Sequence, residues 1–185
     1  MTSPTPDPLA AASVRRATPD DAAAACAVLR RSIAECCLED HRNDQQILSA
    51  WLANKTPENL RAWFSSAGYA VVSVRDGGIV GVAMLSPAGM VTLNYLVPEA
   101  RFQGLGGAML RALEEEAARR GHGELTLCST VTAHRFYLGK GYADTGRVSS
   151  MFGLTSPVMA KMLVKAPVPA ADADGPSTTQ GRPAL

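Results

Sequence analysis

Hydrophobic residues recur with a helical period over roughly the first third of this chain. The spacing predicts three helices, over residues 18–38, 47–52 and 57–64. Thr18 and Thr56 are each followed by a proline, and this pair is typical of a helix start because Thr caps the helix and Pro suits its first turn. The N-terminal part of the chain is therefore expected to be helical.

From residue 69 onward the pattern alternates strands with helices. The strand-like stretches cover residues 69–75, 79–85, 90–97, 124–128, 142–148 and 158–164. The first two flank the turn Asp76-Gly77-Gly78 and predict a hairpin. Helices are predicted over 104–120 and 131–138, and one face of the first carries Leu105, Met109, Leu110, Leu113 and Ala117. This order indicates a mixed α+β layer rather than a strict βαβ repeat.

The composition fits one globular domain with polar ends. The chain has 185 residues, of which 46% are hydrophobic and 19% charged, enough for one hydrophobic core. Seven of the twelve prolines lie outside residues 10–165, and the last twenty residues contain no aromatic residue. Because such ends bury little apolar surface, we expect mobile tails over 1–12 and 166–185 and a domain over 13–165.

Charge and hydropathy argue against several kinds of partner. The net charge is +1, from 18 basic and 17 acidic residues, so we expect neither a nucleic-acid partner nor binding to a membrane surface. No stretch approaches the 18 apolar residues of a membrane span, and the N-terminus lacks the pattern of a secretory signal. Four cysteines show no disulfide framework, and no Cys/His cluster suggests zinc. We therefore expect a cytoplasmic protein with reduced thiols and no metal.

A glycine-rich segment follows the strand at 90–97 and opens the next helix. The first N–H groups of a helix lack internal partners, and Gly104, Gly106 and Gly107 would let a diphosphate approach them closely. A strand-to-helix turn with glycines for close packing is the alternative. A P-loop is excluded because no Lys follows the glycines. A dinucleotide-binding fingerprint is disfavoured because the third spaced glycine is missing and Glu124 lies at the wrong end of its strand.

Two motifs resemble the signatures of the GCN5-related N-acetyltransferase (GNAT) superfamily. Residues 101–106, Arg-Phe-Gln-Gly-Leu-Gly, resemble the family's Arg/Gln-x-x-Gly-x-Gly/Ala signature. Residues 133–142, Ala-His-Arg-Phe-Tyr-Leu-Gly-Lys-Gly-Tyr, resemble the second signature, Asn-x-x-Ala-x-x-Phe-Tyr-x-x-x-Gly-Phe. Thr130 stands where the family usually has Asn, and it keeps a hydrogen-bond donor and acceptor with a shorter reach. In element order the resemblance extends over residues 14–165 and is typical of a bacterial member.

The resemblance implies a fold and a cosubstrate. GNAT domains have a mostly antiparallel sheet flanked by helices and bind acetyl-CoA where two parallel strands splay apart, here 90–97 and 124–129. Backbone groups of Leu96 and Val97 would pair with the pantetheine arm like an added strand. The pyrophosphate would be held by backbone amides of Phe102, Gln103, Gly104, Leu105, Gly106, Gly107 and Ala108, and Arg101 of the same motif would be a further cofactor contact. The remaining predicted cofactor contacts are Thr130, Ala133 and Phe136.

Tyr137 is the candidate general acid. Amine attack on a thioester expels a thiolate, and a phenol with an ordinary pKa of about 10 can protonate it. Packing behind the cofactor is the alternative role for this ring. Glu99, His134 or an ordered water could take the proton of the acceptor ammonium, and a backbone N–H near Val97 could polarise the thioester carbonyl.

The acceptor side is less defined by the sequence. The family places the first helical section over this side of the cleft, so Asp40 and His41 are candidate substrate contacts, together with Asn94. An acidic run formed by Glu35, Glu39, Asp40 and Asp44 could attract a cationic amine, or could be a solvated helix face.

We therefore expect an N-acetyltransferase that moves an acetyl group from acetyl-CoA to a primary amine by direct attack in a ternary complex. The acceptor would be a small molecule or a peptide, with antibiotics, polyamines, amino acids, peptide N-termini and lysine all open, and the protein a monomer or homodimer. A catalytically weak acyl-CoA-binding or regulatory module is the alternative from another functional class. A scaffold that binds no ligand is a third.

Overall fold

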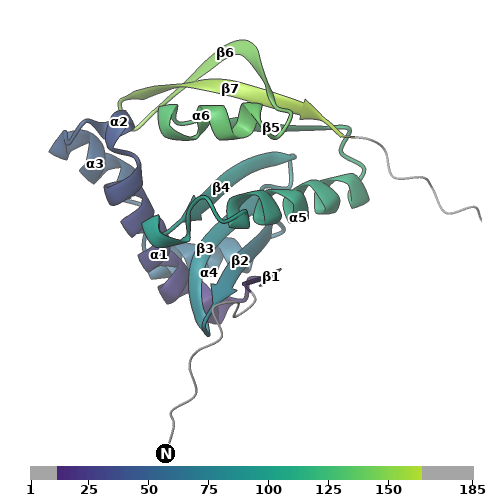
Figure 1. Cartoon of the computed structure of the whole chain (residues 1–185), viewed down its shortest axis with the longest axis horizontal. Coiled ribbons are helices and arrows are strands. Elements are labelled where there is room, and N and C mark those ends of the chain that lie inside the picture. The colour runs from purple at the N-terminus through teal and green to yellow at the C-terminus, as the bar shows by residue number, and fades with distance from the viewer. Residues whose placement is uncertain (1–11, 164–185) are drawn as a thin grey trace, which may run out of the picture.

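The structure is a computed structural model that describes residues 12–163, which build one seven-stranded mixed sheet with helices on both faces (Figure 1). The strands are β1 (Ser13–Arg16), β2 (Tyr69–Arg75), β3 (Gly78–Leu85), β4 (Met90–Leu96), β5 (Glu124–Cys128), β6 (Ala143–Met151) and β7 (Leu154–Met162). The helices are α1 (Ala22–Cys36), α2 (Leu38–His41), α3 (Gln45–Leu52), α4 (Pro57–Phe64), α5 (Leu105–Arg119) and α6 (Val131–Leu138). Short 3-10 turns, η1 (Pro19–Asp21) and η2 (Pro98–Ala100), precede α1 and α5.

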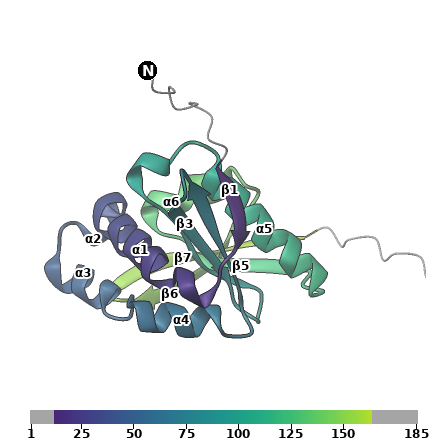
Figure 2. The same ribbon diagram turned by 90° about the horizontal axis from the view of Figure 1, so that it is seen from below.

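Alternate side chains of the central strands face two separate hydrophobic clusters. Val72 and Val82 belong to the cluster that contains the buried residues of α1 and α4. Val71 and Ala83, one position along each strand, belong to the cluster that contains α5. Successive strand residues point to opposite faces, so α1 and α5 cover the sheet from opposite sides (Figure 2). The apolar face predicted for α5 is confirmed, because all five of its residues are buried.

The sheet opens in its middle, between β4 and β5. The strand order is β1-β2-β3-β4-β5-β7-β6, and β4–β5 is its one parallel pair in the described residues. These two strands pair only at Met90 with Thr126 and at Val91 with Leu127, after which β4 continues to Leu96 along β3 alone. The predicted mixed fold with splayed parallel strands is therefore confirmed. Ligands of open sheets with helices commonly bind where such strands part at their carboxyl ends.

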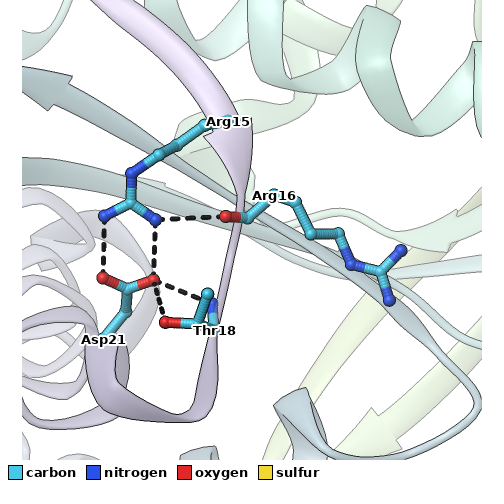
Figure 3. A network of polar contacts seen from close by, with 4 residues as sticks. All are labelled: Arg15, Arg16, Thr18 and Asp21. Atoms are coloured by element: carbon cyan, nitrogen blue, oxygen red, sulfur yellow. Dashed lines mark hydrogen bonds and ion pairs between the residues drawn. The ribbon is translucent and has the colours of Figure 1, made fainter.

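Arg15 ties the first strand to the first helical turn (Figure 3). Its guanidinium donates to both carboxylate oxygens of Asp21, at 2.7 and 2.8 Å, and to the carbonyl of Arg16 at 3.1 Å. The same carboxylate accepts from the Thr18 N–H at 2.8 Å and from its hydroxyl at 3.1 Å. These bonds hold the pKa of Asp21 well below its usual range. The network sets the direction in which the chain enters α1.

Three sequence predictions about the elements need correction. Residues 18–38 do not form one helix, because the backbone of Cys37 leaves the helical region and separates α1 from α2. The edge strand β1 was not predicted. β7 begins at Leu154 rather than at residue 158, and it forms a long hairpin with β6. The predicted tails lie outside the described residues apart from Ala12, and no helix within 12–163 is long and apolar enough to cross a membrane.

Candidate active site

A cleft of about 670 Å³ lies where β4 and β5 separate. It is bordered by the end of α1 and Cys37, by β4 and the end of β5, by the loop and first turn of α5, and by α6. Of the predicted cofactor residues, those that line it are Leu96, Arg101, Phe102, Gly104, Gly106, Gly107, Thr130, Ala133 and Phe136. The candidate acid Tyr137 and the predicted substrate contact Asn94 line it as well. We call this the first cleft.

The start of α5 presents unpaired backbone donors at the first cleft. Gly104 precedes the helix with φ +83°, a left-handed conformation that favours glycine, and its carbonyl accepts the first helical bond from Ala108 at 3.0 Å. The N–H groups of residues 105–107 precede that bond and have no partner within the helix. A Cβ on Gly106 would lie 3.4 Å from Leu96 and 3.6 Å from Phe136, so glycine keeps this surface of the cleft open. The arrangement suits a phosphate group.

The Ala108 N–H was predicted to share in phosphate binding, and that prediction is wrong because Gly104 already accepts its hydrogen. Leu105 is buried, so only its backbone can contribute. Gln103 does not line the cleft: its side chain donates to the Glu99 carbonyl at 2.9 Å and accepts from Arg75 at 2.7 Å. Gln103 thus holds the loop that precedes α5 rather than a ligand.

Three cationic side chains surround the same opening, namely Arg101, Arg135 and Lys140. The Lys140 ammonium would lie 3.1 Å from a Cβ on Gly107, and it lies 5.8 Å from the centre of the Phe136 ring. Arg135 and Lys140 were not among the predicted site residues. Lys140 could have been predicted as a site residue from the sequence, because it lies within the second motif, three residues after Tyr137 and beside a glycine. These charges complement the anionic groups that the α5 amides can bind.

Tyr137 is held in the wall of the first cleft by other aromatic rings. Its ring contacts Phe136 and Tyr142 edge-on, with centroids 5.1 and 5.7 Å apart, and the residue is 7% exposed. Burial raises the pKa of the Tyr137 hydroxyl to about 12, and the side chain of Asn94 opposes this shift in part. The hydroxyl therefore stays protonated at neutral pH, as a proton donor must.

The strand register decides which β4 groups are free. The Val97 N–H donates to Val80 at 3.0 Å and the Val97 carbonyl accepts from Ala100 at 3.0 Å. Both backbone groups of Val97 are therefore already bonded within the protein. Antiparallel pairing alternates the direction of backbone groups, so those of Asn94 and Leu96 point away from β3, toward the opening beside β5. Of the two residues predicted to pair with a pantetheine arm, Leu96 thus has backbone groups free to do so and Val97 has not, and those of Asn94 are free as well.

Thr130 serves as the cap of α6. Its hydroxyl oxygen accepts from the Ala133 N–H at 3.1 Å, so its own hydrogen remains available to the cleft that it lines. Cys128 and Tyr95 line the cleft nearby, and neither was among the predicted site residues. Burial raises the pKa of the Tyr95 hydroxyl above its usual range.

Asp40 and His41 do not lie where the sequence placed them. The Asp40 carboxylate accepts from the Val131 N–H at 2.6 Å and from the Thr132 hydroxyl at 2.7 Å, which fastens α2 to the start of α6. His41 is 1% exposed, and its Nδ1 accepts from the Asn43 N–H at 3.2 Å. Neither residue lines a cleft, so their assignment as substrate contacts is corrected to a structural role.

The two side chains considered as general bases also lie elsewhere. Glu99 is exposed and accepts from Arg31 at 2.6 Å, which lowers the pKa of its carboxyl. His134 contacts Asp144, with its Nε2 2.9 Å from one carboxylate oxygen. Neither lines the first cleft, so neither can take a proton from an acceptor bound there.

A second cleft, of about 380 Å³, adjoins the same gap. It is bordered by α3, α4, β4 and the turn between β6 and β7. The two clefts share six residues, Val91, Thr92, Leu93, Tyr95, Cys128 and Thr130. They therefore meet where β4 and β5 part, so ligands bound in the two clefts would lie close together.

The family model for the acetyltransferase (GNAT) domain matches residues 37–163. This chain belongs to the GNAT acetyltransferase family. The matched residues include the splayed strands β4 and β5 and the six residues that line both clefts. No curated protein matches the chain significantly.

Solved structures of GNAT proteins share the fold. A GCN5-related N-acetyltransferase from Rhodopseudomonas palustris has a TM-score of 0.74 and 26% identity, covering 82% of this chain and 96% of that one. PaiA N-acetyltransferase from Thermoplasma acidophilum, in complex with coenzyme A, has a TM-score of 0.69 and 17% identity, covering 82% of this chain and 99% of that one. YncA from Salmonella typhimurium, with its cofactor acetyl-CoA, has a TM-score of 0.64 and 20% identity, covering 86% of this chain and 98% of that one.

Proposed function

We propose that this GNAT protein transfers an acetyl group from acetyl-CoA to a primary amine, with both substrates bound at once. The observation that carries the proposal is the start of α5, where Gly104, Gly106 and Gly107 line the first cleft and the N–H groups of residues 105–107 have no partner within the helix. Lys140 adds a positive charge beside them. A negatively charged diphosphate suits this arrangement better than any neutral ligand. PaiA and YncA, which share the fold, hold coenzyme A and acetyl-CoA respectively.

The residues present fit acetyl-CoA along the length of the first cleft. The N–H groups of residues 105–107 and Lys140 would hold the pyrophosphate. The free backbone groups of Asn94 and Leu96 would pair with the pantetheine amides. When bound, acetyl-CoA supplies an acetyl group activated as a thioester.

Tyr137 would donate its proton to the departing sulfur atom. The hydroxyl carries that proton at neutral pH because burial raises its pKa to about 12. A side chain held among Phe136 and Tyr142 needs little reorganisation to act. Glu99 and His134 do not line the first cleft. A water bound there would therefore take the proton of the acceptor ammonium.

The test is release of free thiol from acetyl-CoA with a panel of amines, with product mass confirming acetylation of the amine. We expect thiol release that depends on the amine and on the enzyme. A chain that binds acetyl-CoA tightly but never releases thiol faster with any amine would instead be an acyl-CoA-binding module. A chain that millimolar CoA does not stabilise at all would contradict the phosphate site, because a ligand at 100 times its Kd adds about 2.7 kcal/mol.

A further inference from the structure

The second cleft is lined largely by aromatic and other apolar side chains. Trp51 and Phe152 stack with ring centroids 6.4 Å apart, and Trp63 forms another part of the wall. They come from α3, the β6–β7 turn and α4, which are far apart in sequence. Such a wall suits a ligand with a flat or aliphatic body.

Lys55 is the only charged residue among those described that line this cleft. Its Nζ lies 4.9 Å from the centre of the Phe152 ring and 5.9 Å from that of Trp63. The residue is 5% exposed, and burial lowers its pKa. Its backbone is fixed, because its carbonyl accepts from Arg30 at 3.1 Å and its N–H donates to Leu52 at 3.0 Å.

The Lys55 charge has no carboxylate partner within residues 12–163. No Asp or Glu oxygen of these residues lies within 4.0 Å of its ammonium, and the side chain donates one hydrogen bond, to the Asn54 amide oxygen. An ammonium has three N–H donors, so two remain for a ligand. Buried charges in proteins are normally paired, since a lone one is costly.

We propose that the acceptor is a small amine that also carries a carboxylate and an apolar body, in the manner of an amino acid with an apolar side chain. Its carboxylate would pair with Lys55 and its body would lie against Trp51, Trp63 and Phe152. This inference rests on the proposed function, because it assigns the acceptor of that reaction.

The same observations argue against a polycationic acceptor such as a polyamine. No Asp or Glu is among the described residues that line either cleft. The acidic run considered from the sequence does not help, because Glu35, Glu39 and Asp44 line neither cleft and Asp40 is bonded to α6. A cation entering the second cleft would meet Lys55 without any opposing charge.

Binding can be measured without catalysis, because the two tryptophans of the chain both line the second cleft. Tryptophan fluorescence of the full chain is titrated with phenylpropionate and with phenylpropanol, which share a ring and chain length but differ in charge. We expect phenylpropionate to bind at least about tenfold more tightly, the scale of a hydrogen bond to a charged group. Equal or tighter binding of the alcohol would overturn the proposal.

Two substitutions at Lys55 locate the effect. Lys55→Met keeps the length of the side chain without its charge and should abolish the preference for phenylpropionate. Lys55→Arg should retain a preference of at least about threefold because it keeps the positive charge. Arg147→Met removes an exposed charge that lines neither cleft and should leave the preference unchanged. A Lys55→Met variant that is folded, by its melting curve, and keeps the full preference would contradict the assignment of Lys55.

Acetyl transfer is then compared for phenylalanine and phenylethylamine, which differ by the carboxylate. We expect kcat/KM to favour phenylalanine at least about tenfold in the wild type and not in Lys55→Met. Transfer to polyamines or phenylethylamine with no dependence on Lys55 would refute the proposal while leaving the proposed function intact. Lys55-dependent binding of phenylpropionate without transfer to any amine would uphold the anion site and refute the proposed function.

Discussion

The two clefts that meet at the β4–β5 gap are lined by different kinds of chemical groups. The first is lined by the glycines and backbone N–H groups at the start of α5, by basic side chains near them, and by residues of α1, β4 and α6. The second is made of large side chains from α3, α4 and the β6–β7 turn, with Lys55 among them. Backbone donors bind a group that is common to many substrates, whereas side chains select one substrate by shape and charge. Under the proposed function, the first cleft would therefore bind the cosubstrate that the reaction always uses, and the second would select the acceptor.

This difference means that substitutions should act on one side of the gap at a time. A change at the α5 loop should alter CoA binding and leave the second cleft as it was. Tyr137 lies in the wall of the first cleft, and a substitution of its hydroxyl should alter neither binding step if this group acts only during the reaction. Residues away from both clefts should change stability alone.

The largest effect is expected for Tyr137→Phe, which removes the hydroxyl and keeps the ring among Phe136 and Tyr142. If the hydroxyl protonates the departing thiolate, kcat should fall about 100-fold while the Kd for acetyl-CoA stays unchanged. Because the pKa of Tyr137 is about 12, its own ionisation should not reduce the wild-type rate between pH 7 and 10. Steady-state kinetics and calorimetry measure both quantities.

Tyr142→Phe is the matched control for this change. Tyr142 is buried and packs against Tyr137 but lines neither cleft, so its loss of a hydroxyl should change kcat less than about threefold. Full activity of the Tyr137→Phe variant would reduce that residue to a packing role.

Gly106→Val should weaken CoA binding by at least about tenfold, or roughly 1.4 kcal/mol. The new Cβ fits beside Leu96 and Phe136, but the methyl groups beyond it narrow the approach to the α5 amides. Gly106→Ala is the control and should have a smaller effect. Calorimetric titration with CoA gives the affinity, and the tryptophan fluorescence response of the second cleft should be unchanged. If that response also disappears, the two clefts are not independent.

Asp40→Ala should lower the free energy of unfolding by about 2 kcal/mol, because it removes charge-assisted bonds to the Val131 N–H and the Thr132 hydroxyl. Asp40→Asn keeps one acceptor oxygen and should lose less. Denaturant unfolding measures both variants. A change in acceptor selectivity with no loss of stability would return Asp40 to the acceptor side, where the sequence first suggested it.

The smallest effect is expected for Asp21→Asn, at about 1 kcal/mol at neutral pH, since the pair with Arg15 is partly exposed. The pKa of Asp21 is lower in the folded state, so its contribution is complete above its usual value of 3.8 and declines as the pH falls below it. The difference in melting temperature between wild type and variant should therefore shrink in acid. Asp20→Asn, whose carboxylate is 94% exposed, should change stability little at any pH.

Many residues of the first cleft could be predicted from the sequence because they fall within two short motifs. The glycines of α5 and the Phe136–Tyr137 pair each belong to one short motif, and both motifs lie on elements whose periodicity is clear. The register of β4 was not visible in the sequence, since it depends on how Val80 of β3 pairs with Val97. That is why Val97 was expected to have free backbone groups together with Leu96.

The second cleft could not be predicted from the sequence. Trp51, Lys55 and Phe152 come together only through the packing of α3 and α4 against the β6–β7 hairpin, and nothing in their spacing indicates this. Asp40 is a similar case, since its partners lie about 90 residues later in the chain. Local patterns report local structure, and contacts over such separations require the fold itself.

The proposed function depends above all on whether the start of α5 binds the pyrophosphate of CoA. Calorimetric titration of the protein with CoA and with pantetheine tests this binding site. Pantetheine lacks the pyrophosphate and nucleotide but keeps the arm that would pair with β4. We predict that CoA binds at least about 100-fold more tightly, and that Gly106→Val and Lys140→Met each narrow this ratio by tenfold or more. Binding of CoA and pantetheine with similar affinity, or a ratio that neither substitution alters, would contradict the account.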